Sequence, residues 1–149
     1  MKLASFLIPI ILITITAAVI SCSKSNNGSK PTIKIKSINT LIPQGGGLNV
    51  IFDFTSSSAD LARGNFTAIR IRQNQIPLPP GSNSVDTLPW PIPDFTDVTK
   101  GQFQYQLDYN YLHQSDQEND TVIFKFSCVD RAGNKSDTVT SPKIVIETP

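Results

Sequence analysis

The chain has 149 residues, a formal net charge of +1, two cysteines and one histidine. A charge balance this close to neutral creates no field that would attract nucleic acid, so we expect no nucleic-acid partner. The cysteines and the histidine are too few for a typical zinc site, and a histidine-assisted nucleophile depends on His113 alone. The sequence therefore predicts no cofactor and no metal, and we assign no catalytic residue.

The first 22 residues differ from everything that follows. A single Lys2 precedes an apolar run that ends in small residues at Ser21, which is the pattern of a secretory signal peptide. Residues 19–22, Val-Ile-Ser-Cys, resemble the lipobox of bacterial lipoproteins. The resemblance implies cleavage before Cys22 and lipidation of that cysteine, and two or more acyl chains hold a protein stably at a membrane. An uncleaved membrane anchor and ordinary secretion are the alternatives.

We accordingly divide the chain into a lipoprotein signal peptide (1–21), a flexible tether (22–30) and one folded domain (31–149). The tether is small and polar, with nothing to bury. It lacks the acidic stretch that directs some bacterial lipoproteins to the cell surface. We therefore expect a cell-envelope lipoprotein held at the outer membrane by the lipid on Cys22, facing the periplasm rather than the cell surface.

Within the folded domain, hydrophobic residues recur with period two, which indicates half-buried strands. The alternating residues are Ile33 and Ile35; Leu48, Val50, Phe52 and Phe54; Ile69 and Ile71; Phe103, Tyr105, Leu107 and Tyr109; and Val122, Phe124, Phe126 and Cys128. Glycine, proline and serine clusters between these runs supply turns. The pattern predicts an all-β domain, a sandwich or small barrel. Cys128 lies in such a run, so we expect a buried, unreactive thiol.

Residues 129–136, Val-Asp-Arg-Ala-Gly-Asn-Lys-Ser, predict a tight hairpin in which Asp130 accepts hydrogen bonds from turn amides and Gly133 has positive φ. They resemble the closing hairpin of bacterial immunoglobulin-like domains. The resemblance implies an immunoglobulin-like antiparallel β-sandwich of about seven strands. The chain departs from that pattern because it has no cysteine pair between the sheets and carries Phe126 where a corner tyrosine is common. Pro142 predicts that the last strand lies at a sheet edge.

Residues 76–101 contain six of the eleven prolines and the sole tryptophan. We predict a long loop here, and long loops in compact domains are often functional. Prolines on both sides stiffen the chain around Trp90, and Phe95 follows closely. Trp90 and Phe95 are therefore the predicted partner-binding residues. The alternative is that Trp90 folds back and plugs the end of the sandwich.

Two weaker patterns concern acidic residues. Aspartate pairs, Asp94 with Asp97 or Asp53 with Asp60, leave a small hydrolase with paired carboxylates as the rival interpretation. Asp116, Glu118 and Asp120 alternate as in the opening of a calcium loop, but the glycine that turns an EF-hand loop is missing. We interpret this string as a solvated connection between strands and leave calcium open.

The function that the sequence favours is a membrane-anchored, non-catalytic binding or scaffolding module whose partner is an envelope protein or a glycan. Two carboxylates about 5 to 9.5 Å apart in a concave pocket would favour the hydrolase instead. An open surface around Trp90 would favour binding.

Overall fold

The computed structural model describes residues 30–57, 60–95 and 98–149. The predicted signal peptide, the predicted lipidation site Cys22 and the predicted tether up to residue 29 lie outside the described residues. Within the described ranges, no helix is long and apolar enough to cross a membrane.

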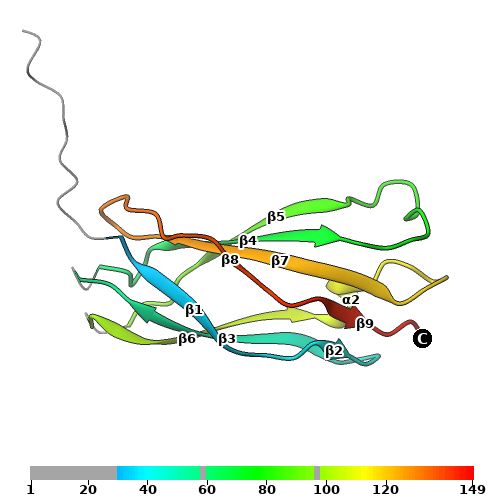
Figure 1. Ribbon diagram of the computed structural model, residues 1–149, viewed down its shortest axis with the longest axis horizontal. Coiled ribbons are helices and arrows are strands. Elements are labelled where there is room, and N and C mark those ends of the chain that lie inside the picture. Colours follow the sequence, from blue (N-terminus) through cyan, green and yellow to red (C-terminus); the bar gives the residue numbers. More distant parts are fainter. Residues whose placement is uncertain (1–29, 58–59, 96–97) are drawn as a thin grey trace, which may run out of the picture.

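The described residues form nine strands and one short helix (Figure 1). The strands are β1 (Thr32–Ile38), β2 (Leu41–Ile42), β3 (Gly47–Thr55), β4 (Asn65–Arg72), β5 (Val85–Pro91), β6 (Lys100–Asp108), β7 (Asp120–Val129), β8 (Val139–Thr140) and β9 (Ile144–Ile146), and the helix is α2 (Tyr109–Leu112). Three of the described connections between strands contain a glycine at positive φ, namely Gly45, Gly81 and Gly133.

The strands form two sheets that pack face to face (Figure 1). One sheet has the order β1-β3-β6, and the other has the order β2-β9-β7-β4-β5, with β8 also paired to β7. All pairs are antiparallel except the short parallel pair of β2 and β9. Immunoglobulin-like domains divide their A, B and E strands from C, F and G in the same way. The predicted all-β immunoglobulin-like sandwich is confirmed.

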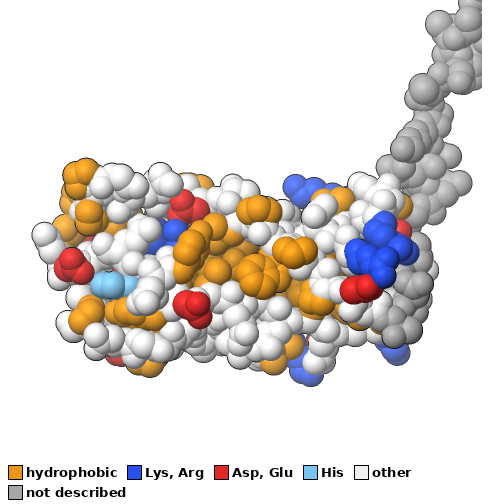
Figure 2. Space-filling model, turned by 180° about the vertical axis from the view of Figure 1, so that it is seen from behind, with side chains coloured by type: hydrophobic (Ala, Val, Ile, Leu, Met, Phe, Trp, Pro, Cys, Tyr) orange, Lys and Arg blue, Asp and Glu red, His pale blue; other side chains and the backbone are white. Residues whose placement is uncertain are grey.

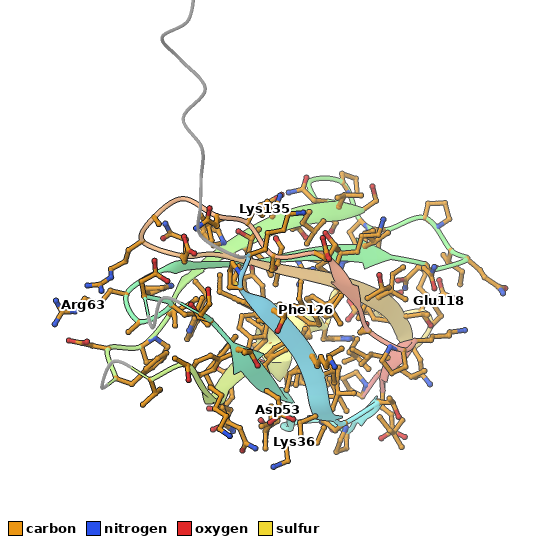
Figure 3. The ribbon with its side chains drawn as sticks, turned by 60° about the vertical axis from the view of Figure 1, so that its left-hand side comes forward. Lys36, Asp53, Arg63, Glu118, Phe126 and Lys135 are labelled. Carbon is orange, nitrogen blue, oxygen red and sulfur yellow. The ribbon has the colours of Figure 1, made fainter. Side chains whose placement is uncertain are left out.

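A cluster of aromatic side chains, among them Phe126 (labelled in Figure 3), lies at the centre of the core between the sheets. Phe52 contacts Phe66, Phe103 and Phe126, with ring centroids 5.2, 5.2 and 4.9 Å apart. Each fully buried phenylalanine stabilises the fold by roughly 1.5–3 kcal/mol, and an aromatic pair adds about 0.5–1.5 kcal/mol. The aromatic cluster thus joins the two sheets in a domain whose one described cysteine, Cys128, is free.

Strand β7 follows the predicted alternation. Its inward residues are fully buried, namely Val122, Phe124, Phe126 and Cys128. Lys125 points the opposite way and is exposed. Burial raises the pKa of the Cys128 thiol, against a smaller lowering by its hydrogen bond to Ser136. The prediction of a buried cysteine is confirmed.

Strand β4 presents the face opposite to the one predicted. Ile69 and Ile71 lie on its outer side and are half-buried, whereas Arg70 and Arg72 point inward and are 2% and 7% exposed. Period two allows either set of alternate residues to face the core. The inward set also includes the fully buried Phe66 and Ala68, and each guanidinium finds a buried or half-buried carboxylate partner there.

The closing hairpin has the predicted turn chemistry. The backbone amide and the side-chain amide of Asn134 donate to the Asp130 carboxylate, at 2.7 and 3.0 Å, and Gly133 has φ 88°. The prediction of a final edge strand is wrong, since β9 pairs with β7 on one side and β2 on the other. Pro142 lies between β8 and β9, outside both strands, so its missing donor interrupts no ladder.

Candidate functional site at the seam between β5 and β6

The two long sides of the sandwich differ. On one side the chain crosses from the first sheet to the second, because β2 follows β1 and pairs with β9. On the other side β5 is the last strand of one sheet and β6 the last strand of the other, and the two do not pair. We call the gap between these two edge strands the seam.

Strand β5 lies inside the segment that the sequence predicted as a loop, so that prediction is wrong. β5 pairs along its whole length with β4, and Trp90 lies opposite Phe66 in the register. Pro89 and Pro91 are compatible with this strand because it is an edge, where a missing backbone donor leaves no ladder bond broken. Trp90 is therefore carried by a strand, which fixes its position more firmly than a loop would.

A hollow of about 580 Å³ lies along the seam. Its lining is mostly apolar and comes from β5, β6 and α2: Leu88, Pro89, Trp90, Tyr105, Gln106, Leu107, Asp108 and Tyr111. Trp90 is 40% exposed and Tyr111 46% exposed. Figure 2, which shows the face behind that of Figure 1, has a broad apolar patch at its centre with charged side chains only around it.

The Trp90 ring meets the core through one edge. Its centroid is 5.6 Å from that of Tyr105, and the two planes are at 85°. Tyr105 is fully buried, and its hydroxyl has no hydrogen-bond partner among the described residues. Burial raises the pKa of this phenol, so it is protonated at neutral pH. A buried hydroxyl without a partner is uncommon in native proteins, and here it belongs to a residue that lines the hollow.

Arg70 supports the rim of the hollow from inside the sandwich. It donates from Nε to Asp86 Oδ2 at 3.0 Å and from Nη1 to the Tyr111 carbonyl at 2.7 Å. Its guanidinium also lies over the Tyr111 ring, 4.9 Å from the centroid. Burial would raise the pKa of Asp86, but the hydrogen bond and charge of Arg70 outweigh it, so the pKa lies below its ordinary value. The opposite charges of Arg70 and Asp86 neutralise each other, so the surface of the hollow is mostly apolar.

The two predicted partner-binding residues lie in different surroundings. Trp90 lines the hollow, whereas Phe95 is half-buried and stacks on Phe54, with centroids 5.1 Å apart. Phe95 is not part of the lining. Both predictions for Trp90 hold in part. The ring packs on the core, as a plug would, but much of it stays exposed, as a binding residue would. Sequence reasoning missed Tyr111, because this residue lies in α2, just beyond the alternating run that ends at Tyr109.

The predicted aspartate pairs have other partners. Asp53 accepts from Gln102 Nε2 at 2.8 Å on the outer face of the sheet. Asp60 is buried and accepts from Ser56 at 3.1 Å, while Asp94 forms a 2.6 Å surface pair with Arg63. Asp97 lies outside the described residues. Of the described residues that line the hollow, Asp108 alone carries a carboxylate.

The acidic string before β7 is divided among several contacts. Asp120 is buried and accepts from Arg72 at 3.1 Å and from two loop amides, those of Gln114 and Ser115. Glu118 accepts from the Ile76 amide at 2.6 Å, and Asp116 is almost fully exposed. In the part of the chain that the structure describes, no three potential metal-ligating side chains form a group.

Comparison with protein-family models and with curated proteins found no match. Among solved structures, the chain is similar to a β-glucosidase from Listeria innocua, with 9% identity and a TM-score of 0.42. That likeness covers 80% of this chain and 16% of the other. It is also similar to the PmoD soluble domain from Methylocystis sp. ATCC 49242 (Rockwell), with 17% identity, a TM-score of 0.33 and coverage of 78% and 89%.

Proposed function

We propose that the chain is a non-catalytic binding or scaffolding module of the cell envelope, and that its contact surface is the seam between β5 and β6. In this proposal the lipid on Cys22 holds the domain at the outer membrane, and the partner is another envelope protein. The observation that carries the proposal is the apolar hollow around Trp90, exposed on a side of the sandwich that none of the described strands closes.

The composition of this surface resembles that of a protein interface. Contiguous exposed apolar patches on soluble domains often mark interaction sites, and tryptophan and tyrosine are frequent anchors of binding energy. Trp90 and Tyr111 are both held by neighbours, through Tyr105 and Arg70, so little conformational freedom is lost when a partner covers them.

A glycan is the second candidate partner, favoured by one observation. An exposed aromatic ring such as Trp90 can stack on a sugar, and the rim offers the amide of Gln106 and the carboxylate of Asp108. Most of the lining is nevertheless aliphatic or aromatic. Such a lining suits an apolar side chain of a protein better than a sugar, which carries many hydroxyl groups. We therefore place the protein partner first.

The rival hydrolase has less support. A paired-carboxylate mechanism needs two carboxyl groups flanking one bond. The lining that the structure describes contributes Asp108, and the nearby Asp86 is bound to Arg70. The exposed surface around Trp90 is the arrangement that we expected of a binding module.

The experiment that tests the proposal compares capture of envelope proteins by the full chain and two variants. Wild type, Trp90→Ala and Leu41→Ala are each tagged and isolated from gently solubilised membranes. Leu41 is the matched control because it is 56% exposed and lies in β2, on the opposite side of the sandwich. We expect Trp90→Ala to weaken capture of a specific protein by at least about thirtyfold, the factor for 2 kcal/mol, while Leu41→Ala captures it normally.

Equal capture by all three forms would contradict the proposal. If capture of proteins is equal but an immobilised oligosaccharide is retained only by forms that keep Trp90, the partner is a glycan and the protein assignment is wrong.

A further inference from the structure

The free edge of β6 is the feature of the seam that the apolar hollow does not explain. β6 is nine residues long, contains no proline and pairs only with β3 among the described strands. Constant-type immunoglobulin domains carry a fourth strand, D, next to the strand in this position. Here the sheet ends at β6, so a row of backbone donors and acceptors is left without a strand partner along the seam.

The two edges of the seam are not equivalent. β5 carries Pro89 and Pro91, and prolines protect an edge by removing donors. β6 has no such protection along its centre, where its outward residues are Gln102, Gln104 and Gln106. Of the two edges, β6 is therefore the one that can accept an added strand.

From the register of this edge we propose that the envelope protein taken up at the seam is a second copy of the chain, joined through an antiparallel β6–β6 pair centred on Gln104. The inference rests on the proposed function, because it uses the same seam. In this register Lys100 of each copy lies opposite Asp108 of the other, so both ends of the pair bring opposite charges together.

The remaining positions of the register are complementary as well. On the outer face Gln102 lies opposite Gln106, and Gln104 lies opposite its own counterpart. Gln102 and Gln104 donate to Asp53 and Asn49 on β3, at 2.8 and 2.7 Å, so a bond to the opposite glutamine uses an amide oxygen or the second amide hydrogen. On the inner face half-buried Leu107 lies opposite Gly101, which has no side chain to obstruct it. A two-fold axis through Gln104 satisfies the requirement that such an interface be self-complementary.

The pairing also accounts for the apolar patch. A two-fold axis at the centre of β6 turns the seam of each copy toward the seam of the other. Tyr105, which Trp90 contacts, is one residue from the axis, so the Trp90 end of each hollow lies beside the second copy. Exposed apolar surface is then removed from water in the dimer. Sheets that join through edge strands in this way use main-chain bonds for affinity and side chains for register.

The test is a disulfide cross-link in the full chain, expressed in an intact envelope. Directly opposite residues in an antiparallel pair have Cβ atoms about 4.5–5.5 Å apart, close to what a disulfide spans. We expect Gln104→Cys to form a covalent dimer on a non-reducing gel. Gln102→Cys is the matched control, since its counterpart is four residues away along the partner strand, about 13 Å, and does not cross-link. Cys128 is buried in both variants and does not interfere.

Charge exchange then tests the register itself. In the purified full chain in detergent, Lys100→Asp or Asp108→Lys places like charges at both ends of the pair and weakens dimerisation by about tenfold in sedimentation, because each dimer holds two such contacts. The double variant Lys100→Asp/Asp108→Lys restores opposite charges and the wild-type dimer. All these side chains are exposed, and near-ultraviolet circular dichroism confirms that each variant is folded.

A monomeric wild type, equal cross-linking at positions 102 and 104, or a double variant as weak as the singles would overturn the inference. A failure of this inference can be distinguished from a failure of the proposed function. If the chain is monomeric but Trp90→Ala still abolishes capture of another envelope protein, the second copy is the wrong partner and the seam remains the contact surface.

Discussion

Trp90 lies edge-on against the buried Tyr105, across the gap between the two sheets, with ring centroids 5.6 Å apart. Trp90 belongs to β5 and Tyr105 to β6, so this contact is a bridge between the unpaired edges of the sandwich. It holds the indole in place while leaving 40% of the residue exposed. A residue held by the core and still open to solvent is well suited to bind a partner with little loss of freedom.

The first prediction concerns the strand at the centre of the core. Phe126→Ala removes a fully buried ring from the aromatic cluster and should lower the free energy of unfolding by about 3–5 kcal/mol. Lys125→Ala, next to it on the exposed face, should change the free energy by less than about 0.5 kcal/mol. A denaturant titration measures both. Equal losses would show that the two faces of β7 are buried alike.

The second prediction concerns the buried pair of Arg72 and Asp120. Asp120→Ala leaves the guanidinium inside the sandwich without its carboxylate and should cost about 3–5 kcal/mol of stability. Replacing both residues by Met and Leu should cost clearly less than the single change, since no unpaired charge is then buried. Asp116→Ala, in the same loop but almost fully exposed, is the control. A paired replacement as harmful as Asp120→Ala would contradict this interpretation.

The third prediction is a pH dependence that comes from Asp86. Its pKa is below the ordinary value in the folded state, because Arg70 outweighs the effect of burial. The stability that the ionised carboxylate contributes is therefore fully present above a pH of about 4 and is lost as the pH falls through the folded-state pKa. The difference in free energy of unfolding between wild type and Asp86→Asn should shrink between pH values of about 5 and 2. A difference that stays constant over this range would show that Arg70 does not stabilise the charged form.

The fourth prediction concerns the free cysteine. Burial raises the pKa of the Cys128 thiol and keeps it from solvent, and the thiolate is the reactive form. In the folded domain at neutral pH, Cys128 should react with an aromatic disulfide reagent only at the rate at which the domain opens. It should react at once in denaturant. Rapid labelling of the folded protein would mean that this end of β7 is open.

The sequence predicted correctly those parts of the fold in which the local sequence pattern agrees with the tertiary structure. The alternation in β7 and the Asp130 turn are such parts, because burial, period and turn chemistry indicate the same structure. The sequence did not show which face of β4 is buried, because one face carries Ile69 and Ile71 and the other Phe66 and Ala68. The arginines on the second face are matched by Asp86 and Asp120, which are distant along the chain. Periodicity cannot show such long-range partners.

The site was predicted only at Trp90. The prolines around it indicated a loop, but they also fit an edge strand, and nothing local distinguishes the two cases. Tyr105, Leu107 and Tyr111 join Trp90 only because β5 and β6 end their sheets on the same side of the sandwich. A surface made by two sheet edges depends on the order of the strands, and a local sequence pattern does not show that order.

The central claim, that the seam around Trp90 is a contact surface, is tested most directly by hydroxyl-radical footprinting of this sole tryptophan. Its modification rate is measured by mass spectrometry for the full chain in the intact cells that produce it and for the same chain purified and diluted. The account predicts that Trp90 and Tyr111 are modified severalfold more slowly in the intact cells, while Leu41 on the opposite side is modified equally in both preparations. Equal rates for Trp90 in the two preparations would contradict the claim.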